Sequence, residues 1–218
     1  MNINLEVFII LILIIIILYL CYIYYYYYRL VKIKSQYDNK DYYVQDTEYS
    51  QEAADLLSKI TEKIEIFNEH IKKSYPNDPR TIRILENYRK NSIKEAPNDP
   101  NFTSYSVNKG EEIRLCVTNN DKLMDLNTMM FVALHEMGHL ASESIGHTTE
   151  FWDNFRWILE ESINIGVYIR QDFKNNPVEY CGISITSTPL DNINLNLNKD
   201  KDKDKTIEAF KLKEGFKY

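Results

Sequence analysis

One uninterrupted apolar run dominates the first part of the chain's hydrophobic and polar pattern. Residues 7–23 carry no charge, and the tyrosines at 24–28 extend the run to 22 residues. A helix needs about 20 apolar residues to cross the hydrocarbon core of a bilayer, and tyrosine rings are favoured at the headgroup level. The run therefore predicts a transmembrane helix over 7–28, within an N-terminal anchor at 1–28.

A cleaved signal peptide is the alternative interpretation of this run. Signal peptides have a basic segment, a shorter apolar core and a small-residue cleavage site. Here Glu6 precedes the run and bulky tyrosines follow it, so we favour an uncleaved anchor. Arg29, Lys32 and Lys34 come next, and the positive-inside rule then predicts a single-pass membrane protein with a cytosolic C-terminal domain.

Beyond the anchor, a polar segment gives way to a helical period. Residues 29–49 predict a polar stalk, and Ser50 offers an N-cap to the helix that follows. Apolar side chains then recur every three or four residues, which is typical of one buried helix face: Ala53, Leu56, Ile60, Ile64, Phe67 and Ile71. We expect the folded domain over 50–189 and a low-complexity tail over 190–218, with a short helix at 205–214.

Two copies of the tetrapeptide PNDP, at 76–79 and 97–100, bracket a second predicted helix. Asp78 can cap it, and Pro79 suits its first turn because the N–H that proline lacks has no partner there. We expect this helix to end near Asn91. Its buried side should consist of Ile82, Leu85 and Tyr88 or Arg89.

The hairpin formed by these two helices is locally basic. A solvated face is the simpler interpretation, and contact with anionic lipid or nucleic acid is the alternative. The basic side chains are Lys72, Lys73, Arg80, Arg83, Arg89, Lys90 and Lys94.

A period of two replaces the helical period at 112–117. Ile113, Leu115 and Val117 fall on one face, which predicts a half-buried strand after a turn at 108–110. Asp125 then caps a third helix. Its apolar positions lead into the segment HEMGH at 135–139, and they are Met129, Met130, Val132, Ala133 and Met137.

Charge and cysteine usage narrow the function classes. The net charge is −6 and the isoelectric point is near 5.3, which argues against a dedicated nucleic-acid binder. The three cysteines form no C-x-x-C pair, and Cys21 lies in the apolar run. We therefore expect Cys116 and Cys181 to be buried free thiols in a reducing compartment, with no disulfide.

The segment HEMGH carries metal chemistry. His135 and His139 are four residues apart and share one helix face, so both imidazoles can reach a single ion. Glu136 lies about 100° round the helix axis, where it can approach a metal's water without being a ligand. Catalytic zinc keeps three protein ligands and one open position. The pattern predicts a zinc site with Glu136 as the catalytic base and a third ligand from elsewhere.

His147 is our preferred third ligand. Gly146 can take the positive φ that lets the chain leave the helix and fold back, and a new helix begins near Thr148 with Phe151 and Trp152 as aromatic anchors. Glu160 or Glu161 is the alternative, since glutamate-liganded zinc proteases place their third ligand at about that distance. His70 stands alone and is expected to be a polar-face residue.

The motifs around these histidines resemble a known family. The segments YSVNKGEEIRLCV (105–117), VALHEMGH (132–139) and GHTTEFW (146–152) are similar to the WLM metallopeptidase group, which is related to the SprT-like and minigluzincin proteases. Its members share an N-x-G-x-x-I-x-L strand, a helix with H-E-x-x-H, and a third histidine before an aromatic pair. The resemblance covers roughly 50–185 of the chain. The seven residues between His139 and His147 are a longer spacing than many members have.

This resemblance implies a fold and a site. The fold class is α+β, a small zincin-like domain of helices on a short sheet, behind one N-terminal transmembrane helix. Zn²⁺ would bind His135, His139 and His147, with Glu136 as the base. The edge strand that pairs with an extended substrate is expected to be Ile113, Arg114, Leu115, Cys116 and Val117. The PVEYCG stretch at 177–182 and the anchor resemble versions from large DNA viruses, which adds a virion membrane to the candidate locations.

The leading hypothesis is a membrane-anchored zinc endopeptidase. Its partners would be a protein or peptide substrate and, through the N-terminal helix, a membrane, while nucleic acid is not expected. The alternative is a catalytically silent membrane protein that keeps the zinc fold as a structural or docking module. A third class, a lipid or nucleic-acid surface binder, would use the basic helical hairpin. The oligomeric state and the substrate are left open by the sequence.

Overall fold

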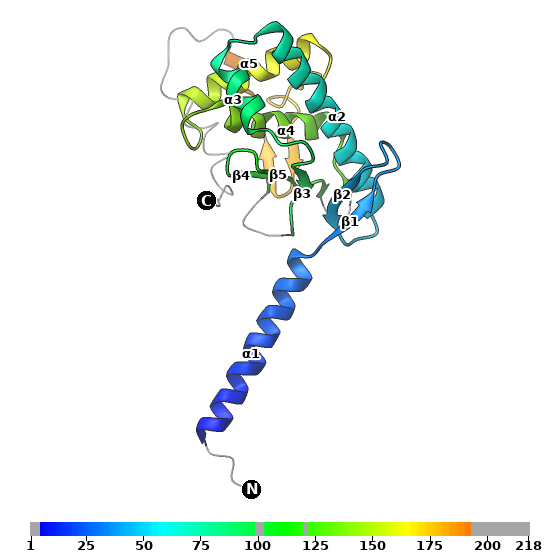
Figure 1. Ribbon diagram of the computed structural model, residues 1–218, viewed down its shortest axis with the longest axis vertical. Helices are drawn as coiled ribbons and strands as arrows, with labels where there is room; N and C mark the ends of the chain where they lie inside the picture. Colours follow the sequence, from blue (N-terminus) through cyan, green and yellow to red (C-terminus); the bar gives the residue numbers. More distant parts are fainter. Residues whose placement is uncertain (1–4, 99–102, 120–121, 193–218) are drawn as a thin grey trace.

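Two parts make up the protein: a long isolated helix and a mixed α+β domain in which helices cover small sheets (Figure 1). The structure, a computed structural model, describes residues 5–98, 103–119 and 122–192. The α+β fold class and the N-terminal helix are confirmed. The short helix expected at 205–214 lies outside the described residues.

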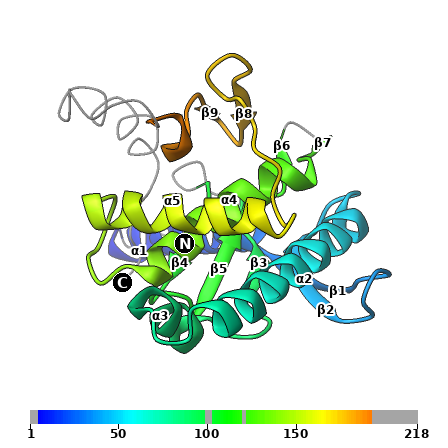
Figure 2. The ribbon, with the colours of Figure 1, turned by 90° about the horizontal axis from the view of Figure 1, so that it is seen from above.

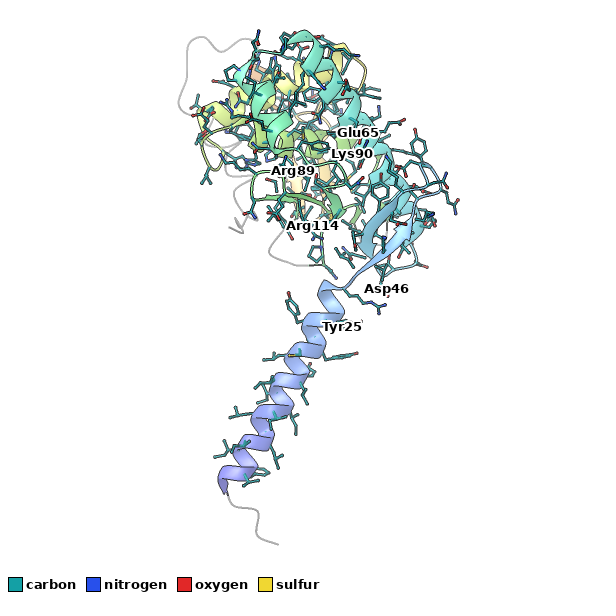
Figure 3. The ribbon with its side chains drawn as sticks, viewed as in Figure 1. Tyr25, Asp46, Glu65, Arg89, Lys90 and Arg114 are labelled. Atoms are coloured by element: carbon teal, nitrogen blue, oxygen red, sulfur yellow. A yellow bond between two sulfur atoms is a disulfide. The ribbon has the colours of Figure 1, made fainter. Side chains whose placement is uncertain are left out.

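The isolated helix is α1 (Leu5–Tyr28). Its segment Val7–Tyr25 is long and apolar enough to cross a membrane, and none of it is buried against the domain. The helix predicted over 7–28 is therefore present. Just beyond it, the Arg29 guanidinium lies 3.4 Å from the Asp46 carboxylate and 5.7 Å from the centre of the Tyr25 ring. Figure 3 shows Tyr25 and Asp46 on either side of this junction.

The prediction of a polar stalk over 29–49 is wrong. This segment forms an antiparallel hairpin of β1 (Leu30–Lys34) and β2 (Asp41–Gln45), so Arg29 alone separates α1 from β1. Tyr42 and Val44 alternate with exposed neighbours and are buried against the domain. The polar residues around them concealed this short period of two. The folded domain therefore begins at the hairpin and not at residue 50.

The first domain helix, α2 (Ser50–Ser74), buries every apolar position expected of it. Its predicted cap is wrong, because the helix starts without a side-chain cap. The Ser50 hydroxyl instead donates to the Gln45 carbonyl at 2.8 Å and accepts from the Thr47 N–H at 3.0 Å. Ser50 thereby joins the start of the helix to the end of β2.

The second helix, α3 (Pro79–Asn87), begins where expected, but its buried face differs from the predicted one. The Asp78 carboxylate accepts from the Arg80 N–H at 2.8 Å, and Pro79 occupies the first turn. The helix ends four residues before Asn91. It buries Thr81 and Ile84, whereas Ile82 and Leu85 are exposed. In so short a helix two apolar residues do not define the buried face, and packing against α2 and α4 sets it.

Three short strands form the central sheet, in the order β3-β5-β4. β5 (Glu112–Leu115) pairs in parallel with β3 (Ile93–Glu95) and antiparallel with β4 (Tyr105–Val107). The expected strand is thus confirmed, with Ile113, Leu115 and Val117 buried. Its expected role as a free edge is wrong, because both sides of β5 are already paired. The three-residue β3 has no recognisable pattern, so the central position of β5 could not be predicted.

The helices α4 (Leu126–Ala141) and α5 (Thr149–Asn164) complete the core. α4 is the central helix and contacts α2, α3, α5 and β5. Figure 2 shows α5 and α2 on the outer side of the domain, with α4 and the sheet beneath them. The predicted apolar positions of α4 are all buried. The helix that carries the HEMGH segment is therefore enclosed on most sides.

Two small hairpins, one before α4 and one after α5, and a final 3₁₀ turn complete the described elements. They are β6 (Thr118–Asn119) with β7 (Lys122–Leu123), β8 (Val178–Tyr180) with β9 (Ile183–Ile185), and η1 (Pro189–Asn192). Leu190 in η1 is buried. The packed domain therefore extends past its expected end at residue 189.

The prediction that Cys116 and Cys181 are free thiols is wrong. A disulfide joins Cys116, at the end of β5, to Cys181 in the turn between β8 and β9. The two cysteines are 65 residues apart. No local motif predicts such a pair, and only the packing of the β8–β9 hairpin against the end of β5 brings them together.

Glu95, on β3, is buried where the first hairpin meets the sheet. Its carboxylate accepts from the Gln45 N–H at 2.7 Å and from the Thr118 hydroxyl at 3.4 Å. Burial nevertheless raises the pKa of Glu95 to about 7. Folding therefore favours its protonated form, and this contribution to stability is lost as the pH rises from about 4.5 through 7.

Replacing this carboxyl should flatten the pH dependence of stability. Glu95→Gln is expected to match the wild type near pH 4.5 and to exceed its free energy of unfolding at pH 8 by on the order of 2–4 kcal/mol. Urea unfolding of the full chain in detergent at both pH values measures this. Glu112→Gln is the control, because Lys94 and Arg114 outweigh burial and lower the pKa of Glu112. That variant should instead lose stability at the higher pH. A wild-type slope retained in Glu95→Gln would contradict the assignment.

Candidate metal centre

The HEMGH segment lies on the last two turns of α4, and both ends of that helix are fixed. At its start the Asp125 carboxylate accepts from the N–H groups of Asn127 and Thr128 at 2.9 and 3.0 Å, as expected of a cap. At its end the Lys109 ammonium donates to the carbonyls of Ser142 and Glu143 at 3.1 and 2.6 Å. A cation there also suits the negative end of the helix dipole.

A tight loop returns the chain from α4 to α5. Gly146 has a φ of +81°, as its predicted role requires. The Glu150 carboxylate accepts from the N–H groups of Glu143 and Ser144 at 2.8 and 3.0 Å, and these bonds lower its pKa to about 2. The Thr148 hydroxyl caps α5 by accepting from the Phe151 N–H. These contacts place His147 over the face of α4.

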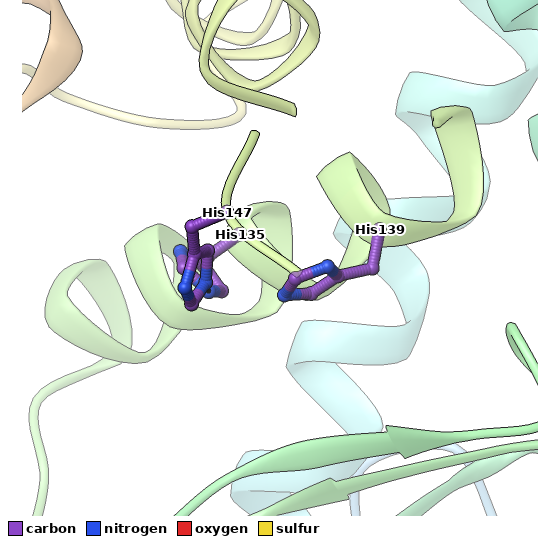
Figure 4. A group of neighbouring side chains, drawn as sticks. All are labelled: His135, His139 and His147. Carbon is purple, nitrogen blue, oxygen red and sulfur yellow. Dashed lines mark hydrogen bonds between the residues drawn. The ribbon is translucent and has the colours of Figure 1, made fainter. Parts of the chain in front are cut away.

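Three histidines consequently meet at one point, as Figure 4 shows. The ligand nitrogens of His135, His139 and His147 all lie within 4.8 Å of one another, and the Nε2 atoms of His135 and His147 are 3.0 Å apart. Zinc–nitrogen bonds of about 2.0–2.1 Å would separate two ligand nitrogens by about 3–4 Å. The three histidines could therefore hold one metal ion.

The charge state of the histidines also suits a metal. Burial lowers the pKa of His135 to about 3. Burial, followed by the neighbouring His135, His147 and Lys109, holds the pKa of His139 well below its ordinary value. Both rings are thus neutral at physiological pH, which is the state that binds a metal ion.

Aromatic rings from α5 enclose the histidines. The Phe151 ring stacks on His139 at 4.3 Å between centroids and also lies 4.8 Å from His135 and 4.6 Å from His147. Trp152 stacks on His147 at 5.4 Å. The expected aromatic anchors are therefore in contact with the site.

Gly138, within HEMGH, was not singled out as a site residue by the sequence pattern. A Cβ atom at this position would lie 3.0 Å from Phe151 Cε2 and 3.2 Å from Phe155 Cβ. These distances are tighter than ordinary van der Waals contact, so any larger residue would require the Phe151 or Phe155 side chain to shift. A glycine in the middle of a buried helix, followed by an aromatic helix, is the signal that could have revealed it.

The glutamates considered as third ligands lie elsewhere. Glu160 is exposed and pairs with Arg156 at 2.9 Å. Glu161 is buried but accepts from the Tyr75 hydroxyl at 3.0 Å and lies 2.8 Å from His70 Nε2. The structure therefore brings His147, and neither glutamate, to the histidine group. The view of His70 as an isolated surface residue is wrong, since it joins α2 to α5.

Glu136 and Tyr180 are two buried groups that interact electrostatically. Glu136 follows His135 on α4 and is 1 % exposed. Burial first, and then the charge of Glu136 among its neighbours, raises the pKa of Tyr180. Tyr180 is also 1 % exposed, and its hydroxyl lies 2.5 Å from the Ser104 hydroxyl. No local pattern in the sequence links Tyr180 to Glu136, because 44 residues separate them.

Carboxylates face much of the basic helical hairpin. Lys90 lies 3.9 Å from Glu65, and Arg83 lies 2.8 Å from Glu143. Lys90 and Glu65 are labelled in Figure 3. Arg80 pairs with Asp78, and Lys94 pairs with Glu112. These pairs favour the solvated-face interpretation over a nucleic-acid surface.

Comparison with known proteins finds similarity to three viral proteins. The chain is 31% identical over 159 residues to uncharacterized protein R325 of Acanthamoeba polyphaga mimivirus, which covers 70% of this chain and 81% of that protein. It is 37% identical over 83 residues to uncharacterized protein 042R of Invertebrate iridescent virus 3, and 32% identical over 69 residues to uncharacterized protein 136R of Invertebrate iridescent virus 6. These two alignments cover 37% and 30% of this chain, and 50% and 38% of the relatives.

No family model matches the chain, and no solved structure matches it. The mimivirus alignment spans most of both proteins at more than 30% identity. The chain therefore belongs to the same protein family as protein R325 of Acanthamoeba polyphaga mimivirus.

Proposed function

We propose that this protein is a membrane-anchored zinc metallopeptidase with a zincin-like domain, as its resemblance to the WLM group implies. The observation that carries the proposal is the meeting of His135, His139 and His147 beside the buried Glu136. Two of these histidines are one turn apart on α4, and the third comes from a separate loop. The fold, and not the local sequence alone, completes the group.

The residues present define the chemistry. A zinc ion held by three neutral imidazoles would supply a Lewis acid and a water of lowered pKa. Glu136 would accept a proton from that water as it attacks the peptide carbonyl, and would then donate the proton to the leaving amine. Phe151 and Trp152 would keep bulk water from the histidines and hold their rings in place.

The alternative is a silent protein that keeps the metal site for structure or docking. Structural zinc sites are almost always closed by four protein ligands. The group found among the described residues contains three ligands, all histidines. A glutamate next to the first ligand has a use in hydrolysis and none in a purely structural site. Both features favour an enzyme.

The substrate would be a polypeptide bound in extended form. β5 cannot receive it, because β3 and β4 flank that strand. β4 (Tyr105–Val107) ends the described sheet on one side and contacts α4. We therefore assign backbone pairing with the substrate to β4 in place of Ile113–Val117.

We also propose that α1 is a permanent anchor and that the domain faces the cytosol. Support for the anchor comes from the tyrosines that follow the apolar run and from the folded hairpin that begins one residue after α1. Support for the orientation comes from Arg29, Lys32 and Lys34. The viral relatives make a virion membrane a second location to examine.

Removing the proposed base should separate catalysis from metal binding. Glu136→Gln is expected to keep zinc and fold, because the amide is nearly isosteric and is not a ligand. Its cleavage of an unfolded protein should fall by about 10²–10⁴-fold. The measurement compares full-length wild type and variant in detergent at matched zinc content. Glu160→Gln, an exposed change on α5, is the control and should retain activity. Equal cleavage by Glu136→Gln and wild type would exclude Glu136 as the base.

Removing the third ligand should reduce metal content. His147→Ala is expected to lower zinc affinity by at least about tenfold, since two imidazoles would remain of three. Glu160→Ala should leave zinc content unchanged, because that side chain lies outside the histidine group. Metal analysis after dialysis against a weak chelator provides the readout. Undiminished zinc in His147→Ala would remove that residue from the ligand set.

The proposed orientation can be tested in sealed membranes. A protease added to vesicles whose cytosolic face is outward should digest the domain beyond Arg29 and spare α1. Vesicles opened with detergent and vesicles whose cytosolic face is inward serve as the two controls. Protection of the domain in vesicles with the cytosolic face outward would reverse the orientation. A chain that begins after residue 28 would instead identify the N-terminal run as a cleaved signal.

A further inference from the structure

The β8–β9 hairpin (Val178–Ile185) stands apart from the central sheet. Its two strands pair only with each other among the described strands. A two-stranded hairpin is at best marginally stable by itself. Its position therefore depends on the burial of Tyr180 and Ile185 in the core and on the contacts that join its turn to the rest of the domain.

The disulfide is the covalent part of that connection. It links Cys181, in the hairpin's turn, to Cys116, the residue that follows β5. Hydrogen bonds reinforce it on both sides: the Thr103 hydroxyl donates to the Cys181 carbonyl at 3.4 Å, and the Cys116 N–H donates to the Ser104 hydroxyl at 3.1 Å. The turn is thus fastened to the residue that follows β5 and to the segment that leads into β4.

The residue before Cys181 reaches the proposed site. Tyr180 is buried, and its hydroxyl lies 2.5 Å from that of Ser104. Burial and the charge of Glu136 raise the pKa of Tyr180, so the ring stays neutral. Ser104 leads directly into β4, and β4 contacts α4. The contacts therefore run from the disulfide through Tyr180, Ser104 and β4 to the helix that carries Glu136. The three histidines lie on α4 and its following loop and take no part in these contacts.

The chemical setting of this disulfide is also informative. In the orientation proposed above the domain lies in the cytosol, where thiols are normally kept reduced. Cytosolic disulfides, where they form, are usually transient and serve catalysis or redox sensing. This disulfide holds residues on the Glu136 side of the site and does not involve the metal ligands. That arrangement fits redox sensing.

We propose that the Cys116–Cys181 disulfide is a redox control of the metal centre: when it is intact it holds Tyr180 and the β8–β9 hairpin behind Glu136, and its reduction releases the hairpin and lowers activity. This inference rests on the proposed peptidase function. A dithiol reductant carries out the step by exchange. One of its thiolates attacks a sulfur of the pair and forms a mixed disulfide, which its second thiol then resolves. Two electrons and two protons pass to Cys116 and Cys181, and the reductant becomes a disulfide.

The test uses the full chain in detergent, oxidised or treated with a dithiol that is removed before assay because thiols bind zinc. Mass spectrometry after thiol alkylation establishes the state of Cys116 and Cys181. Three readouts follow: zinc content, hydrogen exchange of residues 178–185, and cleavage of an unfolded protein. Cys116→Ser/Cys181→Ser mimics the reduced state, and Cys21→Ser, which removes the free cysteine of α1, is the matched control.

Reduction of wild type and of Cys21→Ser should speed exchange at 178–185 and lower cleavage, each by at least tenfold, while zinc content stays constant. The double serine variant should show the reduced behaviour at all times and ignore the reductant. Equal cleavage in both redox states would overturn the proposed redox control, while the peptidase function would still be supported. Failure of alkylation to find a disulfide in the oxidised chain would also overturn it. If exchange at 178–185 speeds up on reduction but no form cleaves any substrate, the peptidase function is contradicted. The conclusion that the disulfide holds the hairpin in place is then still supported.

Discussion

The close approach of α5 to α4 at Gly138 is the constraint on which the rest of the structure depends. Gly138 leaves room for Phe151 and Phe155, and the Phe151 ring touches the rings of His135, His139 and His147. Even a methyl group at 138 would require Phe151 or Phe155 to shift by a few tenths of an ångström, and a larger side chain would require more. Such a shift would act directly on the ring that contacts all three histidines. The histidine group is therefore a product of helix packing, and its low polarity follows from the same aromatic cover.

Features with a local cause could be predicted from the sequence, and those formed by distant partners could not. The periods of α2 and α4, the caps at Asp78 and Asp125 and the turn before β5 each lie within a few residues of their physical cause. The β1–β2 hairpin shows only two buried positions among polar neighbours. β3 is three residues long and has meaning only beside β5, so the central place of β5 could not be foreseen.

The candidate site divides in the same way. His135, Glu136 and His139 follow from helical spacing, and Gly146 supplied a physical reason to prefer His147 to Glu161. The sequence could not show why Glu161 is not a ligand. Its carboxylate pairs with His70, which is 91 residues away in the chain. Tyr180 was missed for the same reason, because it reaches the surroundings of Glu136 only through a hairpin fastened by a disulfide across 65 residues.

The junction between α1 and the domain adds a geometric restriction to the proposed chemistry. Arg29 alone separates α1 from β1, and β2 is bound to the sheet because Glu95 accepts from the Gln45 N–H. A flexible stalk would let the domain range over many distances from a membrane, whereas this direct connection holds it close to the end of α1. If α1 spans a bilayer, the histidine group works at a nearly fixed height above it. Selection among substrates would then begin with the distance of a peptide from the membrane, before any side-chain recognition.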